Sequence, residues 1–156
     1  MTQPPSPTHT RPATLDDLDF LVRCNLQMAL ETEQLELQSA GLHAGIRAVL
    51  TDSTRGFYRI AEREEQRAGC LMITYEWSDW RNAWWWWIQS VYVTPQKRRH
   101  GVFSTLYRNV MHEAQQRSDV CGLRLYVERD NRHAQATYAR LGMHESHYRM
   151  FEQTLA

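Results

Sequence analysis

Apolar residues recur along this chain with two spacings, one typical of helices and one typical of strands. A helix is predicted after the N-cap signal at Thr14, because apolar side chains follow every three to four positions at Leu15, Leu18, Leu21, Val22 and Leu26. Helix-forming residues continue over 28–37, and a second helix is predicted around 40–50. A short strand over 10–13 precedes both helices.

The rest of the chain reads as strands with two further helices. Strands over 56–62, 68–77 and 83–93 are separated by short polar turns and predict an antiparallel meander. A helix over about 101–117, a strand over 123–127, a helix over 131–141 and a last strand over 144–152 follow. The expected fold is α/β, with a mixed, mostly antiparallel, twisted sheet and helices on both faces.

A run of four tryptophans, Trp84 to Trp87, lies inside the third strand of this meander. Side chains alternate along a strand, so Trp85 and Trp87 lie on one face and Trp84 and Trp86 on the other. Core packing with a dimer contact explains such bulk, because buried aromatic residues more often pack than recognise a ligand. The alternative is an aromatic pocket for a substrate, which Trp77 and Trp80 would join.

A basic loop connects the end of that strand to the helix that starts near Gly101. The strand ends at Pro95, and Lys97, Arg98 and Arg99 follow. A helix start presents unpaired N–H groups and the positive end of the helix dipole, and glycine lets a ligand approach the backbone. The segment therefore predicts an anion site, such as one for a pyrophosphate, although a basic turn that caps an ordinary helix gives the same pattern.

A second segment about thirty residues later makes this interpretation more specific. It has the pattern Asn131-x-x-Ala134-x-x-x-Tyr138 and closes with Leu141-Gly142-Met143. With the Arg98-x-x-Gly101 loop after a Val-Tyr-Val strand, this segment resembles the GNAT superfamily of acetyl-CoA-dependent N-acetyltransferases. The resemblance covers roughly residues 57–150 and implies the GNAT fold. One position departs from the family pattern, because Phe103 stands where a small residue is expected.

The resemblance implies a set of residues that hold acetyl-CoA. The third meander strand would splay from the strand that follows the helix, so that free backbone groups pair with the pantetheine arm and one N–H donates to the thioester oxygen. The implied cofactor-binding residues are Val91, Tyr92, Val93, Arg98, Arg99, His100, Gly101, Val102, Phe103, Asn131, Ala134 and Tyr138.

Tyr138 is the implied general acid. A tyrosine has an ordinary pKa of about 10 and is protonated at neutral pH, and a thiolate of pKa about 8.5 takes its proton at a cost of roughly 2 kcal/mol. Asn131 is expected to cap the helix that carries Tyr138. The alternative for Tyr138 is a residue that only packs its helix onto the sheet.

The general base is open at this point. Relatives place a carboxylate in the strand before the basic loop, but here that stretch is Ile88-Gln89-Ser90. Gln89 can orient a water but cannot accept the proton of the amine. The remaining candidates are Glu31, Glu33, Glu76 and Asp79, each of which is otherwise a solvated surface acid.

Composition excludes several other classes of function. The chain has 156 residues, 18 basic and 18 acidic side chains and 42% hydrophobic residues, which disfavours a general nucleic-acid binder and global disorder. No apolar run is long enough to span a bilayer, and no metal site is expected from the spacing of the histidines. Three unclustered cysteines suit a reducing, cytoplasmic setting and are read as buried small hydrophobes. We expect a Pro-rich disordered tail over 1–8 and one domain over 9–156.

The sequence thus predicts an enzyme that acetylates a primary amine of a small molecule or peptide by direct attack in a ternary complex. Acidic candidates suit a polyamine, an aminoglycoside or a lysine side chain, whereas the tryptophans suit an aromatic or hydrophobic amine. The family makes a homodimer plausible. The rivals are a non-catalytic acyl-CoA-binding domain and a partner-binding module that uses the tryptophan surface.

Overall fold

The computed structural model describes residues 6–155 and forms two compact units, which divide between Leu125 and Tyr126. Of the predicted tail over 1–8, residues 1–5 lie outside the described part of the chain, and Thr8 already belongs to the first strand.

The first unit is built on a five-stranded sheet in which the strands follow one another in chain order. The first four strands pair antiparallel, and the last two pair parallel. This confirms the mixed, mostly antiparallel sheet. The strands are β1 (Thr8–Pro12), β2 (Phe57–Arg63), β3 (Gln66–Ser78), β4 (Ala83–Val93) and β5 (Val120–Arg124).

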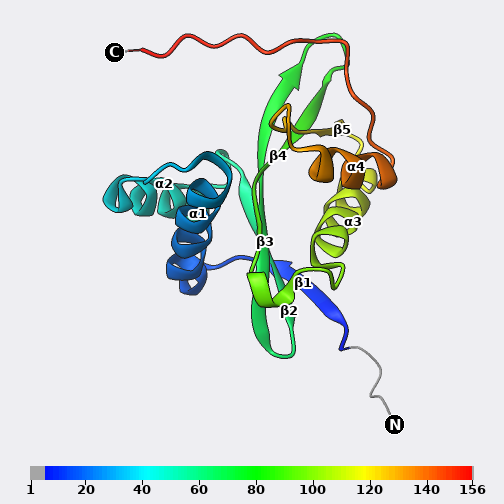
Figure 1. Ribbon diagram of the computed structural model, residues 1–156. Coiled ribbons are helices and arrows are strands. Elements are labelled where there is room, and N and C mark those ends of the chain that lie inside the picture. The colour runs from blue at the N-terminus through cyan, green and yellow to red at the C-terminus, as the bar shows by residue number, and fades with distance from the viewer. Residues whose placement is uncertain (1–5, 156) are drawn as a thin grey trace. The chain divides into compact units, whose positions relative to one another are not determined.

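Helices cover both faces of this sheet, as predicted. Figure 1 shows α1 (Leu18–Glu33) and α2 (Ser39–Thr51) on one face and α3 (Val102–Gln115) on the other. Single 3₁₀ turns at Leu15–Asp17 and Pro95–Lys97 lead into α1 and into the loop before α3. The second unit contains α4 (Arg132–Arg140).

Each face buries its own apolar layer. On the α1 side, helix residues pack against alternate strand residues in a cluster that includes Leu21, Ile46, Tyr58, Ile60, Cys70 and Tyr92. On the other side, α3 buries Val102, Leu106, Val110 and Ala114, the face that the helical spacing predicts. Phe103, the next residue after Val102, is only half-buried and packs its ring against Tyr107.

Two predicted strands differ from the observed ones. The strand expected over 123–127 lies at Val120–Arg124, because β5 pairs with β4 there and leaves the ladder after Arg124. The last strand, expected over 144–152, is wrong: those residues have no regular structure, pair with no strand of the described chain and are exposed. A strand exists only where its backbone groups find a ladder partner, which the residue pattern alone does not supply.

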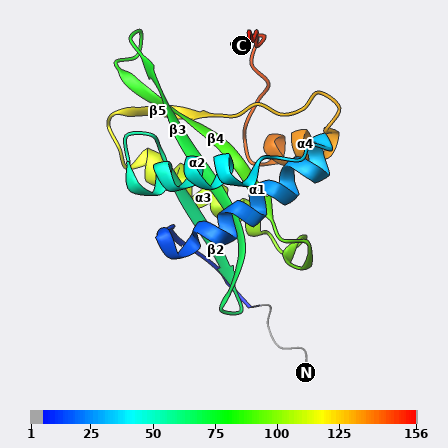
Figure 2. The same ribbon diagram turned by 90° about the vertical axis from the view of Figure 1, so that its left-hand side faces the viewer.

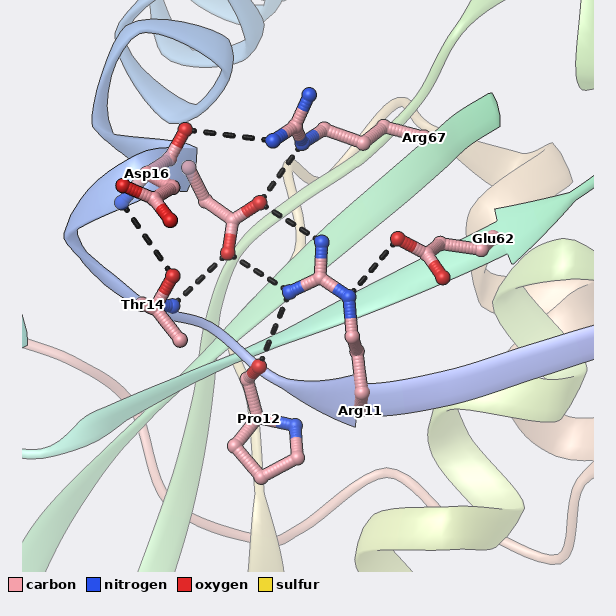
Figure 3. A network of polar contacts seen from close by, with 7 residues as sticks. Arg11, Pro12, Thr14, Asp16, Glu62 and Arg67 are labelled. Atoms are coloured by element: carbon pink, nitrogen blue, oxygen red, sulfur yellow. Dashed lines mark hydrogen bonds and ion pairs between the residues drawn. The ribbon is translucent and has the colours of Figure 1, made fainter. Parts of the chain in front are cut away.

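A buried carboxylate joins β1, β3 and the start of α1. The side chain of Asp17 is fully buried, and the guanidinium of Arg11 donates two hydrogen bonds to it at 2.8 and 2.9 Å. Arg67 donates a third at 2.7 Å, and the backbone N–H of Thr14 a fourth at 2.8 Å, as Figure 3 shows for the labelled partners. Arg11 also bonds Glu62 of β2.

The partners of Asp17 decide its protonation state. Burial opposes the charged form, but the hydrogen bonds from Arg11, Thr14 and Arg67 outweigh it and hold the pKa of this carboxyl well below its usual range. Thr14 and Asp17 also form the capping box at the start of the first helix, which confirms the predicted N-cap. One residue thus fixes the helix start to two strands.

We predict that Asp17→Asn lowers the free energy of unfolding by about 3–5 kcal/mol, because it leaves two guanidinium groups without their buried counter-charge. Urea unfolding at pH 7 measures this loss. Asp16→Asn is the matched control, since the Asp16 side chain is exposed and should change stability by less than about 0.5 kcal/mol.

The loss should also depend on pH in one direction. A depressed carboxyl pKa stabilises the fold above the unfolded-state value of about 3.9, and this stabilisation is lost as pH falls through the lower folded-state value. The difference between wild type and Asp17→Asn should therefore be constant from pH 5 to 7 and shrink only below about pH 4. Equal stability of the two proteins at pH 7 would contradict this assignment.

Candidate functional site

Strand β4 is paired on both sides along only its first half. Its pairing with β5 runs from Trp84 to Trp87, while its pairing with β3 continues to Val93. The β5 side of residues 88–93 therefore carries no partner strand in the described part of the chain. This open stretch is the splay that the sequence predicted, and it arises because β5 leaves the ladder at Arg124.

A β-bulge lies in the middle of the open stretch. Gln89 opposes Met72 and Tyr92 opposes Cys70, so Ser90 and Val91 share a single opposing residue. Ser90 has a left-handed backbone conformation, with φ of 50°. The extra residue reverses the faces of the strand: Trp86 packs on the α3 side, near Arg117, whereas Tyr92 joins the α1 core.

The backbone groups of the open stretch have a defined direction. The N–H of Thr94 donates to the carbonyl of Ala68 at 2.9 Å, so it points toward β3. Because successive residues of an antiparallel strand alternate, the N–H groups of Val91 and Val93 point toward the open edge. The carbonyl of Val93 accepts a hydrogen bond from the Arg98 side chain at 3.0 Å.

The loop before α3 has the features of an anion site. Arg99 and Gly101 have φ values of 64° and 72°, and Gly101 is the N-cap of α3. Successive backbone N–H groups in such conformations form a concave donor surface. A Cβ placed on Gly101 would meet no atom within 4 Å, so space for a ligand is open there. His100, between these two residues, is exposed.

Arg98 is held by α1 rather than left open toward this loop. Its guanidinium donates to Glu31 at 2.7 Å and lies over the ring of Tyr92, whose hydroxyl donates to the same carboxylate at 2.8 Å. We call Glu31, Tyr92 and Arg98 the loop clamp. The hydrogen bond from Tyr92, and to a lesser extent that from Arg98, lowers the pKa of Glu31. Burial and the hydrogen bond to Glu31 raise the pKa of Tyr92 to about 12.

A second set of paired groups lies across three strands. Alternate residues share a face, and Met72 of β3 packs against the α1 core, so Thr74 and Glu76 lie on this face as well. Their neighbours on β4 and β5 complete a half-exposed patch, here called the acceptor floor, which consists of Thr74, Glu76, Trp85, Trp87, Gln89 and Arg124. The sequence predicted the separate faces of the tryptophans correctly but gave no sign of the role of Arg124.

The four acidic residues considered as the general base differ in the hydrogen bonds and ion pairs that they form. Glu76 accepts the indole N–H of Trp87 at 2.9 Å and a guanidinium N–H of Arg124, and Glu31 belongs to the loop clamp. Glu33 is exposed as the last residue of α1, and Asp79 is exposed in the β3–β4 turn, where it accepts the N–H of Trp80. Glu76 and Gln89 thus lie on the same face of the sheet without contacting each other, and Asp79 lies in the turn.

Two tryptophans do not join the acceptor floor. Trp77 lies on the opposite face, where its ring packs edge-on against Trp84 at 4.9 Å. Trp80 is 87% exposed at the turn of the β3–β4 hairpin, whose end extends past α1 and α2 in Figure 2. The single aromatic pocket that would have included both residues is therefore wrong. The α3 face instead holds a packed cluster with Phe57 and Tyr75.

In the second unit, α4 begins at Arg132 because Asn131 caps it. The side chain of Asn131 accepts the N–H of Ala134 at 3.1 Å, as predicted for a helix cap. Tyr138 lies in the last turns of α4, its carbonyl accepts the N–H of Met143 at 3.1 Å, and burial raises the pKa of its phenol. The phenol is therefore protonated at neutral pH.

The acidic and cysteine side chains form no further kind of site in the described part of the chain. Within residues 6–155, no group of three or more His, Cys, Asp or Glu side chains is placed to hold a metal ion, and no helix is long and apolar enough to cross a bilayer. Cys24 and Cys70 are buried free thiols, as predicted, while Cys121 is half-buried and donates to the carbonyl of Trp84.

Comparisons with known proteins agree with this geometry. Residues 22–143 match the profile of the family described as Acetyltransferase (GNAT) family. A solved structure of a possible acetyltransferase from Clostridium difficile 630 is 40% identical, with 96% of this chain and 98% of that chain covered and a TM-score of 0.90. No curated protein matches the chain.

Two more distant structures show the same fold with a ligand. A predicted acetyltransferase with acetyl-CoA from Clostridium acetobutylicum is 18% identical, with 94% of this chain and 96% of that chain covered and a TM-score of 0.74. An aminoglycoside N-acetyltransferase in complex with CoA is 14% identical over 100% of both chains, with a TM-score of 0.76.

We predict a small coupling within the loop clamp. Arg98 and Glu31 are both more than a third exposed, so solvent screens the pair, and a double-mutant cycle of Glu31→Gln and Arg98→Gln should give about 0.3–1 kcal/mol in urea unfolding. The coupling should fall when salt is raised from about 0.05 to 0.5 M. Strictly additive single changes would mean that α1 and the loop are not joined by this pair.

Proposed function

Because this chain belongs to the acetyltransferase (GNAT) family of acetyl-CoA-dependent N-acetyltransferases, we propose that it moves an acetyl group from acetyl-CoA directly to a primary amine in a ternary complex. The observation that carries the proposal is the open edge of β4 beside the loop of Gly101. This arrangement offers strand-like donors for an extended amide chain and helix-start donors for a pyrophosphate.

The residues present fit acetyl-CoA, which supplies an activated acetyl group. The N–H groups of Arg99, His100, Gly101 and Val102 would hold the pyrophosphate, since they lie at the start of α3 where no intrahelical acceptor exists. The side chain of Val102 itself is buried against Gly69. Phe103 keeps its backbone donor, while its ring turns toward Tyr107.

The clamp gives Arg98 and Tyr92 indirect roles in this proposal. Arg98 holds the Val93 carbonyl and the Glu31 carboxylate, so it positions the loop rather than bonding the phosphates. The ring of Tyr92 packs in the α1 core and fixes the strand beyond the bulge. The N–H groups of Val91 and Val93 are left for the cofactor arm and for the oxygen on which charge develops.

Tyr138 is the proposed proton donor to the departing sulfur. As the amine nitrogen bonds to the acetyl carbon, the C–S bond breaks, and the thiolate takes the phenol proton. The amide nitrogen loses one proton to water, and Tyr138 regains one from water, so the reaction yields an amide and a neutral thiol. Asn131 and Ala134 support this role by setting the start of α4.

The amine must shed its ammonium proton before it attacks. Glu76 and Glu31 are both held by arginines, and these contacts occupy their carboxylate oxygens. Glu33 is exposed at the end of α1 and accepts no hydrogen bond in the described part of the chain. We propose that water, oriented by Gln89, carries this proton, with Glu76 as the one carboxylate of the floor.

Because arginines occupy the oxygens of Glu76 and Glu31, a second function is considered: a domain that binds acyl-CoA without transferring the acyl group. It predicts cofactor binding with no product from any amine. An assay of free thiol with an amine panel, run beside acetyl-CoA binding by thermal shift, separates the two functions. Binding with turnover supports the enzyme, and binding without turnover supports the sensor.

We predict that Tyr138→Phe lowers kcat by about 10²-fold or more, because the departing thiolate loses its positioned proton donor. Affinity for acetyl-CoA should stay within about twofold, which a ligand-dependent shift in Tm measures. Tyr148→Phe is the control, since Tyr148 is an exposed tyrosine of the same unit and should leave both quantities unchanged. An unaltered kcat in Tyr138→Phe would remove Tyr138 from the mechanism.

A further inference from the structure

The acceptor floor has no unpaired formal charge. Its one carboxylate, Glu76, is paired with its one guanidinium, Arg124, and the remaining oxygen of Glu76 accepts the indole N–H of Trp87. Gln89 donates to the hydroxyl of Thr74. A polycation that approached this face would have to displace Arg124 from Glu76 before it gained a counter-charge of its own.

Glu31, the acidic candidate near the end of α1, also has both of its carboxylate oxygens hydrogen-bonded. Glu31 accepts from Arg98 and Tyr92, and this pair ties it to the cofactor loop rather than to an incoming ligand. Polyamines and aminoglycosides carry several ammonium groups, which need several carboxylates in reach. The acceptor floor has a single carboxylate, Glu76, and both of its oxygens already accept a hydrogen bond.

The floor places an indole near the open edge of β4. Trp87 lies three residues before the bulge at Ser90, which corresponds to about 10 Å along the strand. Trp85 already has the guanidinium carbons of Arg124 and Arg81 at 3.9 and 5.1 Å from its ring centre. A second cation on Trp85 would therefore meet like charge, whereas an uncharged ring would not.

From these contacts we infer that the acceptor is a monoamine whose single primary amine is joined by a short chain to an aromatic ring. The amine would lie at the open edge near Ser90, and the ring would lie on the floor beside Trp87. The inference rests on the proposed function, whose transfer step it leaves unchanged. The floor gives the ammonium form of the amine no added stability, because its carboxylate, Glu76, is already paired with Arg124.

The test is a panel of amines assayed with the full chain and acetyl-CoA by release of free thiol. The panel contains 2-phenylethylamine, 2-cyclohexylethylamine as its non-aromatic match, spermidine and kanamycin. We expect kcat/KM to be highest for 2-phenylethylamine, by about tenfold or more over the two polycations. A higher value for spermidine or kanamycin would overturn the inference while the proposed function stood. No product from any of the four, with acetyl-CoA bound, would overturn the inference and favour the acyl-CoA-binding domain over the enzyme.

Two variants test the residues that carry the inference. Trp87→Leu should lower kcat/KM for 2-phenylethylamine by about tenfold through loss of the aromatic contact, whereas Trp80→Leu, on the exposed hairpin turn, should leave it unchanged. Acetyl-CoA binding by Trp87→Leu shows that it has folded. Equal losses in both variants, or no loss in Trp87→Leu, would contradict the placement of the ring.

Arg124→Gln tests whether the pairing of Glu76 with Arg124 selects against polycations. It frees the carboxylate of Glu76, so the ratio of kcat/KM for spermidine to that for 2-phenylethylamine should rise by about threefold or more. Because Glu76 and Trp87 remain, this variant does not depend on the Trp87 result. A ratio that stays constant would mean that the Glu76–Arg124 pair does not select against polycations, and would overturn that part of the inference.

Discussion

The half-paired strand β4 is the constraint on which the rest of the site depends. Its first half is locked between β3 and β5, and its second half is held by β3 alone. A strand paired on one side keeps its shape but leaves backbone donors for a ligand. The bulge at Ser90 then turns Tyr92 into the α1 core, which anchors the open half without a second strand.

Arginine pairing repeats throughout the first unit and has a different consequence in each place. At Asp17, which is fully buried, two arginines make a carboxylate part of the framework of the fold. In the loop clamp and on the acceptor floor, the pairs are half-exposed and contribute little to stability. What they change is the chemistry available to a ligand, because the oxygens of Glu76 and Glu31 already accept hydrogen bonds from neighbouring side chains.

The sequence predicted most of what local patterns determine. The bounds of β4 follow from a turn at its start and Pro95 after its end, and Thr14 and Asn131 cap helices as expected. The features that it missed depend on contacts between distant residues. Nothing local marks Ser90 as a bulge, since it is not a glycine, and nothing in the first turn of α1 shows that Asp17 would be enclosed by Arg11 and Arg67. The prediction of a strand over 144–152 was wrong for the same reason, because no local pattern supplies a pairing partner.

Amide hydrogen exchange with and without acetyl-CoA tests the central claim most directly. The account predicts slower exchange in the presence of acetyl-CoA at Val91 and Val93, whose N–H groups face the open edge, and over 99–103 at the start of α3. The amides of β1 and β2 should not change, since they lie at the far side of the sheet. Protection confined to other segments, or absent altogether, would mean that the open edge of β4 is not where the cofactor binds.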